Sequence, residues 1–460
     1  MHYFFDSAII RKWSNARVMP GRLEKHPGNP LWKEGFFAEP ALPWEVRIDN
    51  GYPNVFYDPL IGRYRCYYTC IVQDVVCEST PLSMRKNSEY HPTKERVTAL
   101  LYAESVDGIH WEKPSLGLID FGGSTQNNML RLHQHGAGVM LDLEEQDESR
   151  RYKLAARDDS VGGLCAAFSA DGIHFSQPVR IHAELKGDSH NAVLREANGQ
   201  YLLYTRMFYR RQRTVGRLIS HDFLNWHDER QVLAGNGLGD QAYAMPVFEQ
   251  DGWYWGLCAV YHGGDETAAK YDHVDVELCC SDDGVHWQRL APGIPFVPNG
   301  SGVYGQEDCA CDAGCCFASV PVEDGDQLRF YYIGGNGRHY GFREGGLCMA
   351  SIDRQKLAGV WAVDEEKPFV VQTVPMHSQH GKLAICADVA PGGSIRYALL
   401  DKNGCPVEGF TEEACKPFTE SGKALKLAWT GDRPWPQTWM LKLVCRNAAL
   451  YQLNGDYSLV

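Results

Sequence analysis

The chain has 460 residues and a formal net charge of -13, with 12% aromatic and 22% charged residues. A chain of this length can bury a large core. Its negative charge argues against a nucleic-acid backbone or an anionic membrane surface as a partner. The 12 Trp and 23 Tyr, set between 46 Gly and 23 Pro, are typical of an all-β protein with many turns.

The N-terminal residues Met1 to Asp6 show no basic segment followed by an apolar one, so we expect no signal peptide. No apolar stretch approaches the length of a membrane span. The 16 cysteines are scattered through strand-like segments. We therefore expect reduced, mostly buried thiols and a cytoplasmic location, with an exported, disulfide-rich protein as the alternative.

In chain order, five units begin with a pair of apolar strands joined by a turn. The predicted first strands are 53–57, 138–142, 191–195, 245–248 and 317–321. The predicted second strands are 63–68, 152–156, 201–205, 253–257 and 328–332. Further strand candidates follow, such as 98–104 in the first unit and 163–168 in the second. Five units of four antiparallel strands predict a five-bladed β-propeller over about residues 45 to 365.

A short phrase, Ser-x-Asp-Gly-x-His followed by an aromatic residue, marks the later part of several units. It begins at Ser105, Ser169 and Ser281, with a degenerate copy at Ser220 and a faint echo at Ser351. Asp-Gly is a tight hairpin signal because glycine tolerates a positive φ. We therefore interpret the phrase as a turn between the two outer strands of a blade, with its aromatic residue packed between blades, and not as a catalytic motif.

The pattern changes after residue 365, where alternating strands continue without the phrase. The sequence therefore predicts an all-β chain with two domains: a five-bladed propeller over residues 1–365, which includes an N-terminal extension 1–44, and a small β-sandwich over residues 366–460. We find no catalytic constellation in the second domain.

The blade topology predicts where the chemistry lies. The first strands line the central axis, so the residues just before them point into one funnel, and the second strands end at the same face. The candidate catalytic acids are Asp49, Asp188, Asp240, Glu307 and Asp312. The candidate substrate-binding residues are Asn50, Tyr52, His135, Arg157, His190, Asn191, Arg206, Tyr243, His262 and His339. Carboxylates that converge on one pocket suit glycoside cleavage, in which one acid protonates the leaving oxygen and another attacks the sugar or activates water.

The segment Ile48-Asp-Asn-Gly-Tyr-Pro-Asn-Val-Phe-Tyr-Asp58, the Ser-x-Asp-Gly turns and the trailing sandwich resemble the five-bladed glycoside hydrolases of families 32, 43 and 68. The resemblance implies Asp49 as nucleophile or base and Asp188 as the auxiliary carboxylate. The family 32 acid is a Glu in a Glu-Cys-Pro triplet, and Ala244 occupies the nearest equivalent position here. The acid is therefore Asp240, or it comes from the fifth blade as Glu307 or Asp312.

The predicted function is hydrolysis of a small oligosaccharide, with a fructosyl or arabinosyl furanoside as the expected substrate, and without a cofactor or metal. Cys309-Ala-Cys311 and Cys315-Cys316 lack the spacing of a zinc knuckle, so we expect small buried side chains there. The absence of the family's Glu makes a non-catalytic carbohydrate-binding propeller one alternative. Glycoside phosphorolysis is another, because Arg157, Arg206, Arg338 and His339 are expected near one mouth. Retention or inversion and homo-oligomerisation stay open.

Overall fold

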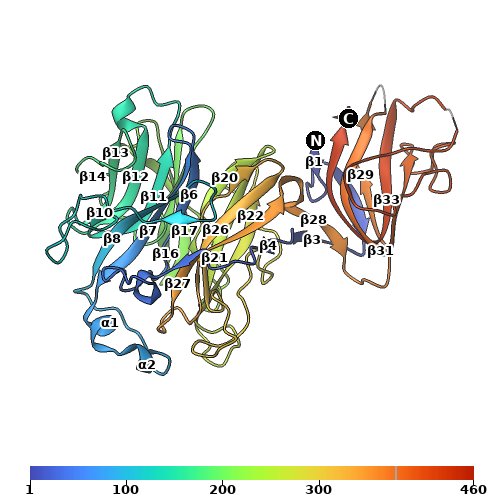
Figure 1. Ribbon diagram of the computed structural model, residues 1–460. Helices are drawn as coiled ribbons and strands as arrows, with labels where there is room; N and C mark the ends of the chain where they lie inside the picture. Colours follow the sequence, from blue (N-terminus) through green and yellow to red (C-terminus); the bar gives the residue numbers. More distant parts are fainter. Residues whose placement is uncertain (379–380, 432) are drawn as a thin grey trace. The chain divides into compact units, whose positions relative to one another are not determined.

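The computed structural model describes residues 1–378, 381–431 and 433–460, and within these the protein is almost entirely β-structure (Figure 1). The chain divides into two compact units, Leu23–Ser351 and Met1–Arg22 with Ile352–Val460. The division thus lies earlier than the expected boundary at residue 365, and residues 1–22 belong with the C-terminal unit. The described α-helices, α1 (Val75–Ser79) and α2 (Leu82–Arg85), are short. No described helix is long and apolar enough to cross a membrane.

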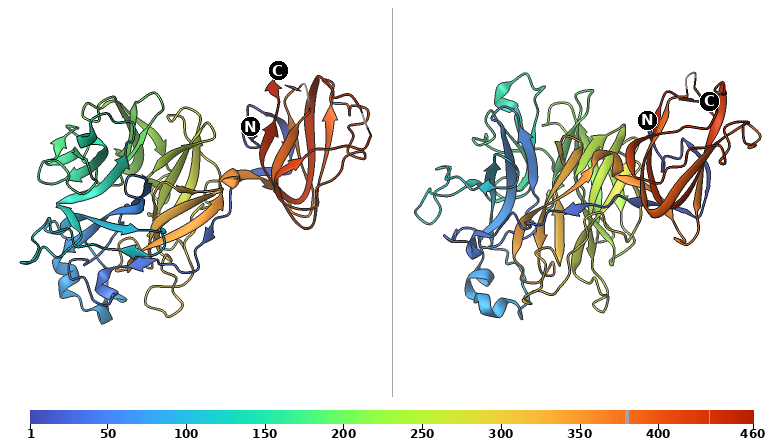
Figure 2. Two further views of the ribbon diagram at one scale, coloured as in Figure 1. Left: turned by 45° about the horizontal axis from the view of Figure 1, so that its top comes forward. Right: turned by 45° about the vertical axis from the view of Figure 1, so that its right-hand side comes forward.

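The unit Leu23–Ser351 is built from five blades of antiparallel strands that follow each other around a common axis (Figure 2, left), and a parallel pairing of Val274 with Cys315 joins blades 4 and 5 into one sheet. Blade 1 holds β6 (Asn54–Asp58), β7 (Arg63–Gln73), β8 (Val97–Ser105), β9 (Trp111–Glu112) and β10 (Met129–Leu132). Blade 2 holds β11 (Gln134–Leu141), β12 (Tyr152–Asp158), β13 (Gly163–Ser169) and β14 (Val179–Arg180). Blade 3 holds β15 (Ala192–Arg195), β16 (Tyr201–Tyr209), β17 (Gln212–Ser220) and β18 (His227–Ala234).

Blade 4 holds β19 (Gln241–Ala244), β20 (Val247–Gln250), β21 (Trp253–His262), β22 (His273–Ser281) and β23 (Gln288–Arg289). Blade 5 holds β24 (Cys315–Ala318), β25 (Val322–Asp324), β26 (Gln327–Gly335) and β27 (Gly345–Asp353). The predicted first and second strands of all five units are present within a few residues of their expected bounds. The five-bladed β-propeller is confirmed.

The outer strand of blade 5 comes from the other end of the propeller sequence. β4 (Glu24–Lys25) and β5 (Trp32–Lys33) pair antiparallel with β27, with Lys25 opposite Ala350 and Lys33 opposite Gly346. The last blade is therefore completed by the first strands of the unit, which closes the ring. Blades 5 and 1 also share a hydrophobic core that includes Tyr68 and Tyr331.

The Ser-x-Asp-Gly phrases form turns at the outer edge of the blades, as predicted, and the Ser and Asp side chains of each turn bond its own backbone. In blade 1, Ser105 Oγ accepts a hydrogen bond from the Gly108 N–H at 2.9 Å, and Asp107 Oδ1 accepts from two further backbone N–H groups. A tyrosine of the preceding blade then bonds the turn: Tyr331 OH donates to Gly108 O at 3.0 Å. Tyr67 and Tyr204 bond Gly172 and Gly284 in the same way. The phrase therefore links neighbouring blades.

The second unit is dominated by one strongly bent sheet. Two strands of 18 residues, β31 (Leu383–Leu400) and β33 (Thr438–Gly455), pair over their length with a register shift between Val389 and Ser394. The shorter strands are β1 (His2–Tyr3), β2 (Ile10–Ser14), β3 (Ala16–Pro20), β28 (Ala358–Ala362), β29 (Phe369–Thr373), β30 (Met376–His377), β32 (Gly422–Lys426) and β34 (Ser458–Leu459). The bend lets the sheet enclose a core of its own, with Phe4, Tyr397, Trp439 and Leu443 fully buried.

Candidate active site

The turn before β6 places Asp49 at the axial end of blade 1. Asp49, Gly51 and Tyr52 have φ of +56°, +65° and +44°, a left-handed conformation that Asp and Gly tolerate better than most residues. Glu34 fixes this turn from behind, because its Oε1 accepts hydrogen bonds from Ile48 N at 2.9 Å and Gly345 N at 3.1 Å. The turn is thereby tied to β27 of blade 5.

Two arginines hold the Asp49 carboxylate in its ionised form. Its Oδ1 accepts from Arg343 Nη2 at 3.2 Å and from Arg47 Nε at 3.3 Å. Burial favours the neutral acid, but the charges of Arg343 and Arg47 outweigh it and hold the pKa of Asp49 well below its usual range. The side chain remains 21% exposed. Asp49 is therefore a charged carboxylate that a ligand can reach, and it cannot supply a proton at neutral pH.

Asn50 connects three blades through one amide. Its Oδ1 accepts from Arg343 Nη2 at 2.9 Å, while its Nδ2 donates to Tyr52 OH at 2.8 Å and to Tyr243 OH at 3.1 Å. His339 Nε2 lies 3.0 Å from the same Tyr243 hydroxyl. Blade 1 is thus joined to β19 of blade 4 and to the loop between β26 and β27 of blade 5.

Blade 3 adds a second carboxylate to this group. Arg206, near the end of β16, lies with its guanidinium 4.1 Å from the centre of the Tyr243 ring and 3.4 Å from Asp188 Oδ2. The Asp188 side chain is 33% exposed, so it is open to a ligand although Arg206 is buried. Asp188 lies four residues before the start of β15, which explains its position at the axis.

Three histidines complete the group, and all are neutral at neutral pH. His135 of β11 lies edge-on to the Tyr52 ring, with centroids 5.4 Å apart, and burial with Arg96 lowers its pKa to about 4. Burial lowers the pKa of His190 to about 3. Burial and the charge of Arg343 hold the pKa of His339 well below its ordinary value. Neutral imidazoles can both donate and accept hydrogen bonds, as the hydroxyls of a sugar require.

We call the residues that these contacts connect the axial cluster. It consists of Arg47, Asp49, Asn50, Tyr52, His135, Asp188, His190, Arg206, Tyr243, His339 and Arg343. All five blades contribute to it. A narrow cavity of about 30 Å³ is lined by residues in or next to the first strands of all five blades, which marks the propeller axis. Nine of the fifteen predicted site residues lie in the cluster, and one of them, His190, also lines this cavity.

The other three predicted acids lie outside the cluster. Both oxygens of Asp240 accept from Arg289 Nη1, at 2.7 and 2.9 Å, and Arg289 also pairs with Glu277. Asp312 accepts from Lys25 Nζ at 2.6 Å and from Tyr332 OH at 2.8 Å, within blade 5. Glu307 is exposed on the loop before β24. None of them has a described contact with Asp49. Arg289 and Lys25, from strands of the same blades, neutralise Asp240 and Asp312 instead.

Three predicted binding residues also bond outside the cluster. Asn191 Nδ2 donates to three backbone carbonyls and its Oδ1 accepts from Thr205, so it fixes the turn before β15. His262 Nε2 lies 3.1 Å from Asp275 Oδ2 across β21 and β22. Arg157 Nε donates to Asp159 at 2.7 Å. These contacts give Asn191 and His262 structural partners, and leave Arg157 at the rim.

The sequence reasoning missed most of the positive charge around Asp49. Arg47 and Arg343 contact it directly, and Arg213 lies with its guanidinium 5.0 Å from the Tyr243 ring centre. Arg96 acts on the pKa of both Asp49 and His135, yet it has no hydrogen bond or ion pair with any residue that the structure describes. Arg47 stands two residues before Asp49, but Arg96 and Arg343 reach the axis only through the loops after β7 and β26.

Comparison with known proteins yields similarity to solved structures alone. No protein-family model matches the chain, and no curated protein matches it. A structure described as "The GH130 family of mannoside phosphorylases contains glycoside hydrolases that target beta-1,2 mannosidic linkages in Candida mannan" is 16% identical, with a TM-score of 0.47 over 72% of this chain and 94% of that chain.

Two further structures match at a similar level. A glycosyl hydrolase from Bacteroides ovatus is 15% identical, with a TM-score of 0.47 over 72% of this chain and 94% of its own. An N-acetylgalactosamine deacetylase from F. plautii, in complex with blood group B trisaccharide, is 15% identical, with a TM-score of 0.45 over 75% and 97%. None of these three descriptions names families 32, 43 or 68, so that resemblance stays a prediction. A functional proposal must rest on the axial cluster itself.

Proposed function

We propose that the axial cluster cleaves glycosidic bonds. The observation that carries this proposal is the pairing of an ionised, partly exposed Asp49 with a second exposed carboxylate, Asp188, among neutral histidines and tyrosines. Hydroxyl-binding groups around two carboxylates match what hydrolysis of a glycoside requires: one group to bear or attack the positive charge at the anomeric carbon and one to protonate the leaving oxygen. The expected substrate is a small oligosaccharide that ends in a furanoside.

The electrostatics assign a role to Asp49. It stays ionised because Arg343 and Arg47 contact it, so it acts as the nucleophile or as the base that activates water. By elimination, the proton donor to the leaving oxygen is Asp188, the other carboxylate found in the described cluster. Asn50, Tyr243 and His339 form one hydrogen-bonded chain that orients the sugar.

Phosphorolysis is the second candidate, and the charge of the cluster favours it. Six guanidinium groups act on Asp49, His135 or His339, against the two carboxylates of the cluster; they belong to Arg47, Arg96, Arg157, Arg206, Arg213 and Arg343. Such an excess of Arg suits an oxyanion, because guanidinium binds phosphate oxygens through paired hydrogen bonds. Inorganic phosphate would then replace water as the attacking group, and Asp49 would orient the sugar.

The test is turnover of a panel of nitrophenyl glycosides, fructo-oligosaccharides and arabino-oligosaccharides, measured with and without inorganic phosphate. We expect cleavage that Asp49→Asn and Asp188→Asn each reduce by about 10³-fold. Asp240→Asn is the matched control, because Arg289 holds that carboxylate outside the cluster and its loss should leave the rate constant unchanged. Dependence on phosphate would select phosphorolysis over hydrolysis. Calorimetric binding of a sugar without any cleavage would contradict both and leave a carbohydrate-binding propeller.

A further inference from the structure

Two cysteines of blade 5 have their sulfur atoms within hydrogen-bond distance of each other. Cys311, on the loop before β24, and Cys348, on β27, are free thiols whose Sγ atoms lie 3.5 Å apart. In a disulfide the two sulfurs are about 2.05 Å apart, so an approach of about 1.5 Å would join them. Cys311 is half-buried, and residues 301–303 and 305–308 of its loop are exposed. The loop is therefore the partner that can move.

The two thiols differ in their exposure and in their acidity. Cys348 is fully buried, whereas Cys311 is open to a small oxidant. The hydrogen bond with Cys348 holds the pKa of Cys311 below its ordinary value, although burial opposes this, and the charge of Lys25 acts in the same direction. The thiolate is the form of cysteine that reacts with a peroxide. Cys311 is therefore the thiol that reacts first, with Cys348 placed beside it as the second thiol.

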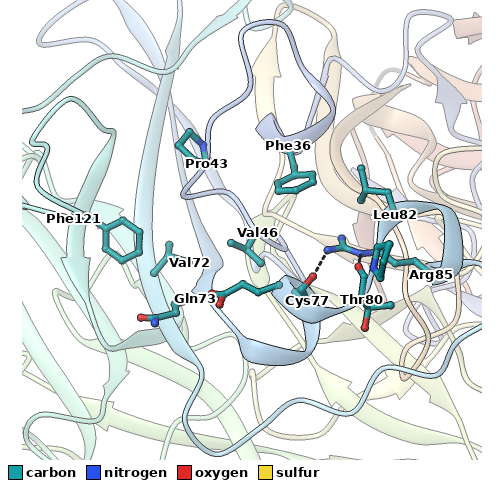
Figure 3. A pocket seen from close by; sticks show the side chains of 13 residues that line it. Phe36, Pro43, Val46, Val72, Gln73, Cys77, Thr80, Leu82, Arg85 and Phe121 are labelled. Atoms are coloured by element: carbon teal, nitrogen blue, oxygen red, sulfur yellow. Dashed lines mark hydrogen bonds between the residues drawn. The ribbon is translucent and has the colours of Figure 1, made fainter.

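Other cysteines of the chain lack this combination of access, acidity and a partner. Cys77 lines a cavity of about 590 Å³ beside α1 and α2, where its carbonyl oxygen accepts a hydrogen bond from Arg85 (Figure 3). Burial raises the pKa of the Cys77 thiol to about 11, and none of its described contacts is with another cysteine. Cys258 and Cys279 share a thiol hydrogen bond, but both are buried. Cys405 is exposed, but no described contact joins it to another thiol.

We propose that Cys311 and Cys348 are a redox modification site, at which a peroxide forms a reversible disulfide within blade 5. The Cys311 thiolate attacks one oxygen of the peroxide, so that the O–O bond breaks, hydroxide leaves and a sulfenic acid forms. The Cys348 thiol then attacks the sulfenic sulfur; the S–S bond forms, the S–O bond breaks, and the leaving hydroxide takes the thiol proton as water. In sum, the two sulfurs give two electrons to one hydrogen peroxide, which becomes two waters.

The disulfide ties the loop before β24 to the strand at which the ring closes. Asp312, next to Cys311, binds Lys25 of β4 at 2.6 Å, and Cys348 belongs to β27, which pairs with β4. The bond therefore fixes blade 5 where the two ends of the propeller sequence meet. Because the two cysteines are 37 residues apart, the bond restricts the unfolded chain and should raise the midpoint of thermal unfolding by about 5 °C. This effect does not depend on the proposed function.

The test treats the full chain with hydrogen peroxide, raised until the exposed Cys405 is oxidised, then alkylates free thiols and analyses unreduced peptides by mass spectrometry. We expect peptides joined through Cys311 and Cys348, which dithiothreitol separates, and the rise of about 5 °C in the unfolding midpoint. Cys348→Ala should abolish both and leave a sulfenic acid on Cys311 that dimedone labels. Cys405→Ser is the matched control, and it should keep the disulfide and the rise.

The result that overturns the proposal is read from the same peptides. Free Cys311 and Cys348 beside an oxidised Cys405, or a bond from Cys311 to the neighbouring Cys309, would exclude the pair. An equal rise of the unfolding midpoint in the wild type and in Cys348→Ala would exclude the effect on blade 5. Cys311→Ser is the second variant, because a half-buried position tolerates the change; it should lose the disulfide, the rise and the dimedone label together.

Discussion

Acidification from about pH 7.5 to about pH 5 should destabilise the propeller through His190, whose environment disfavours its charged form. The residue is 3% exposed, and its Nε2 lies 3.1 Å from Asn54 Oδ1. Asn54 in turn donates to the carbonyls of Tyr52 and Ala137, so the contact joins three blades near the axis. A protonated imidazole in this site would be a buried charge without a counterion.

The sign and size follow from the two pKa values. The pKa of His190 is about 3 in the folded protein and its ordinary value is 6.5. Between these two pH values, His190 binds a proton in the unfolded chain but not in the folded one. Stability is therefore highest above the ordinary pKa and falls as the pH drops below it. A pH of about 5 lies about 1.5 units below the ordinary pKa. The free energy of unfolding is therefore lower there by about 2 kcal/mol.

Urea unfolding followed by tryptophan fluorescence at the two pH values measures this loss, and His190→Gln isolates it. Glutamine keeps a donor for Asn54 but does not titrate, so the variant should lose about 2 kcal/mol less than the wild type over the same interval. His135 and the carboxylates titrate in both proteins and cancel in the comparison. The same loss in wild type and variant would refute the claim that burial keeps His190 neutral.

Three further substitutions test the scaffold. Gly108→Ala should lower the free energy of unfolding by about 3 kcal/mol, because the new Cβ lies 2.3 Å from Tyr331 OH and φ is +76°. Gly117→Ala is its control: φ is +69° but no atom lies within 4 Å, so the loss should be about 1 kcal/mol in the same urea assay. Lys25→Met leaves the buried Asp312 without its cation and should cost about 3 kcal/mol, with the turnover rate constant unchanged. Lost turnover in a folded Lys25→Met protein would instead place Asp312 in the catalytic machinery.

Local pattern predicted the blades well because it acts over neighbouring residues. The Asp-Gly turn is specified within one phrase, where Asp107 and Ser105 bond the backbone that follows them. The same pattern located Asp49 and Asp188, since both stand in the short segment that leads into an innermost strand. The pattern could not predict which partner the side chain at such a position contacts. Asp240 also precedes an innermost strand, but it turns to an arginine on β23.

The other contacts that the sequence did not predict join residues far apart in the chain, which meet only when the ring of blades closes. Lys25 neutralises Asp312 because β4 joins blade 5, and no local signal in residues 24–25 connects them to β27. Arg343 reaches Asp49 across almost the full length of the propeller sequence. Such pairs depend on three-dimensional neighbours that only the completed ring creates, so composition and spacing carry no trace of them.

The pairing of β4 and β5 with β27 has a consequence for synthesis on the ribosome. The edge of blade 5 cannot be covered until β27 has emerged, so β4 and β5 must wait through the translation of four complete blades. During this time β6 and β7 can already pair, because they adjoin in sequence, whereas Arg343 cannot yet meet Asp49. The contact between Arg343 and Asp49 can therefore form only after the last blade has been made, so the axial cluster is completed together with the ring.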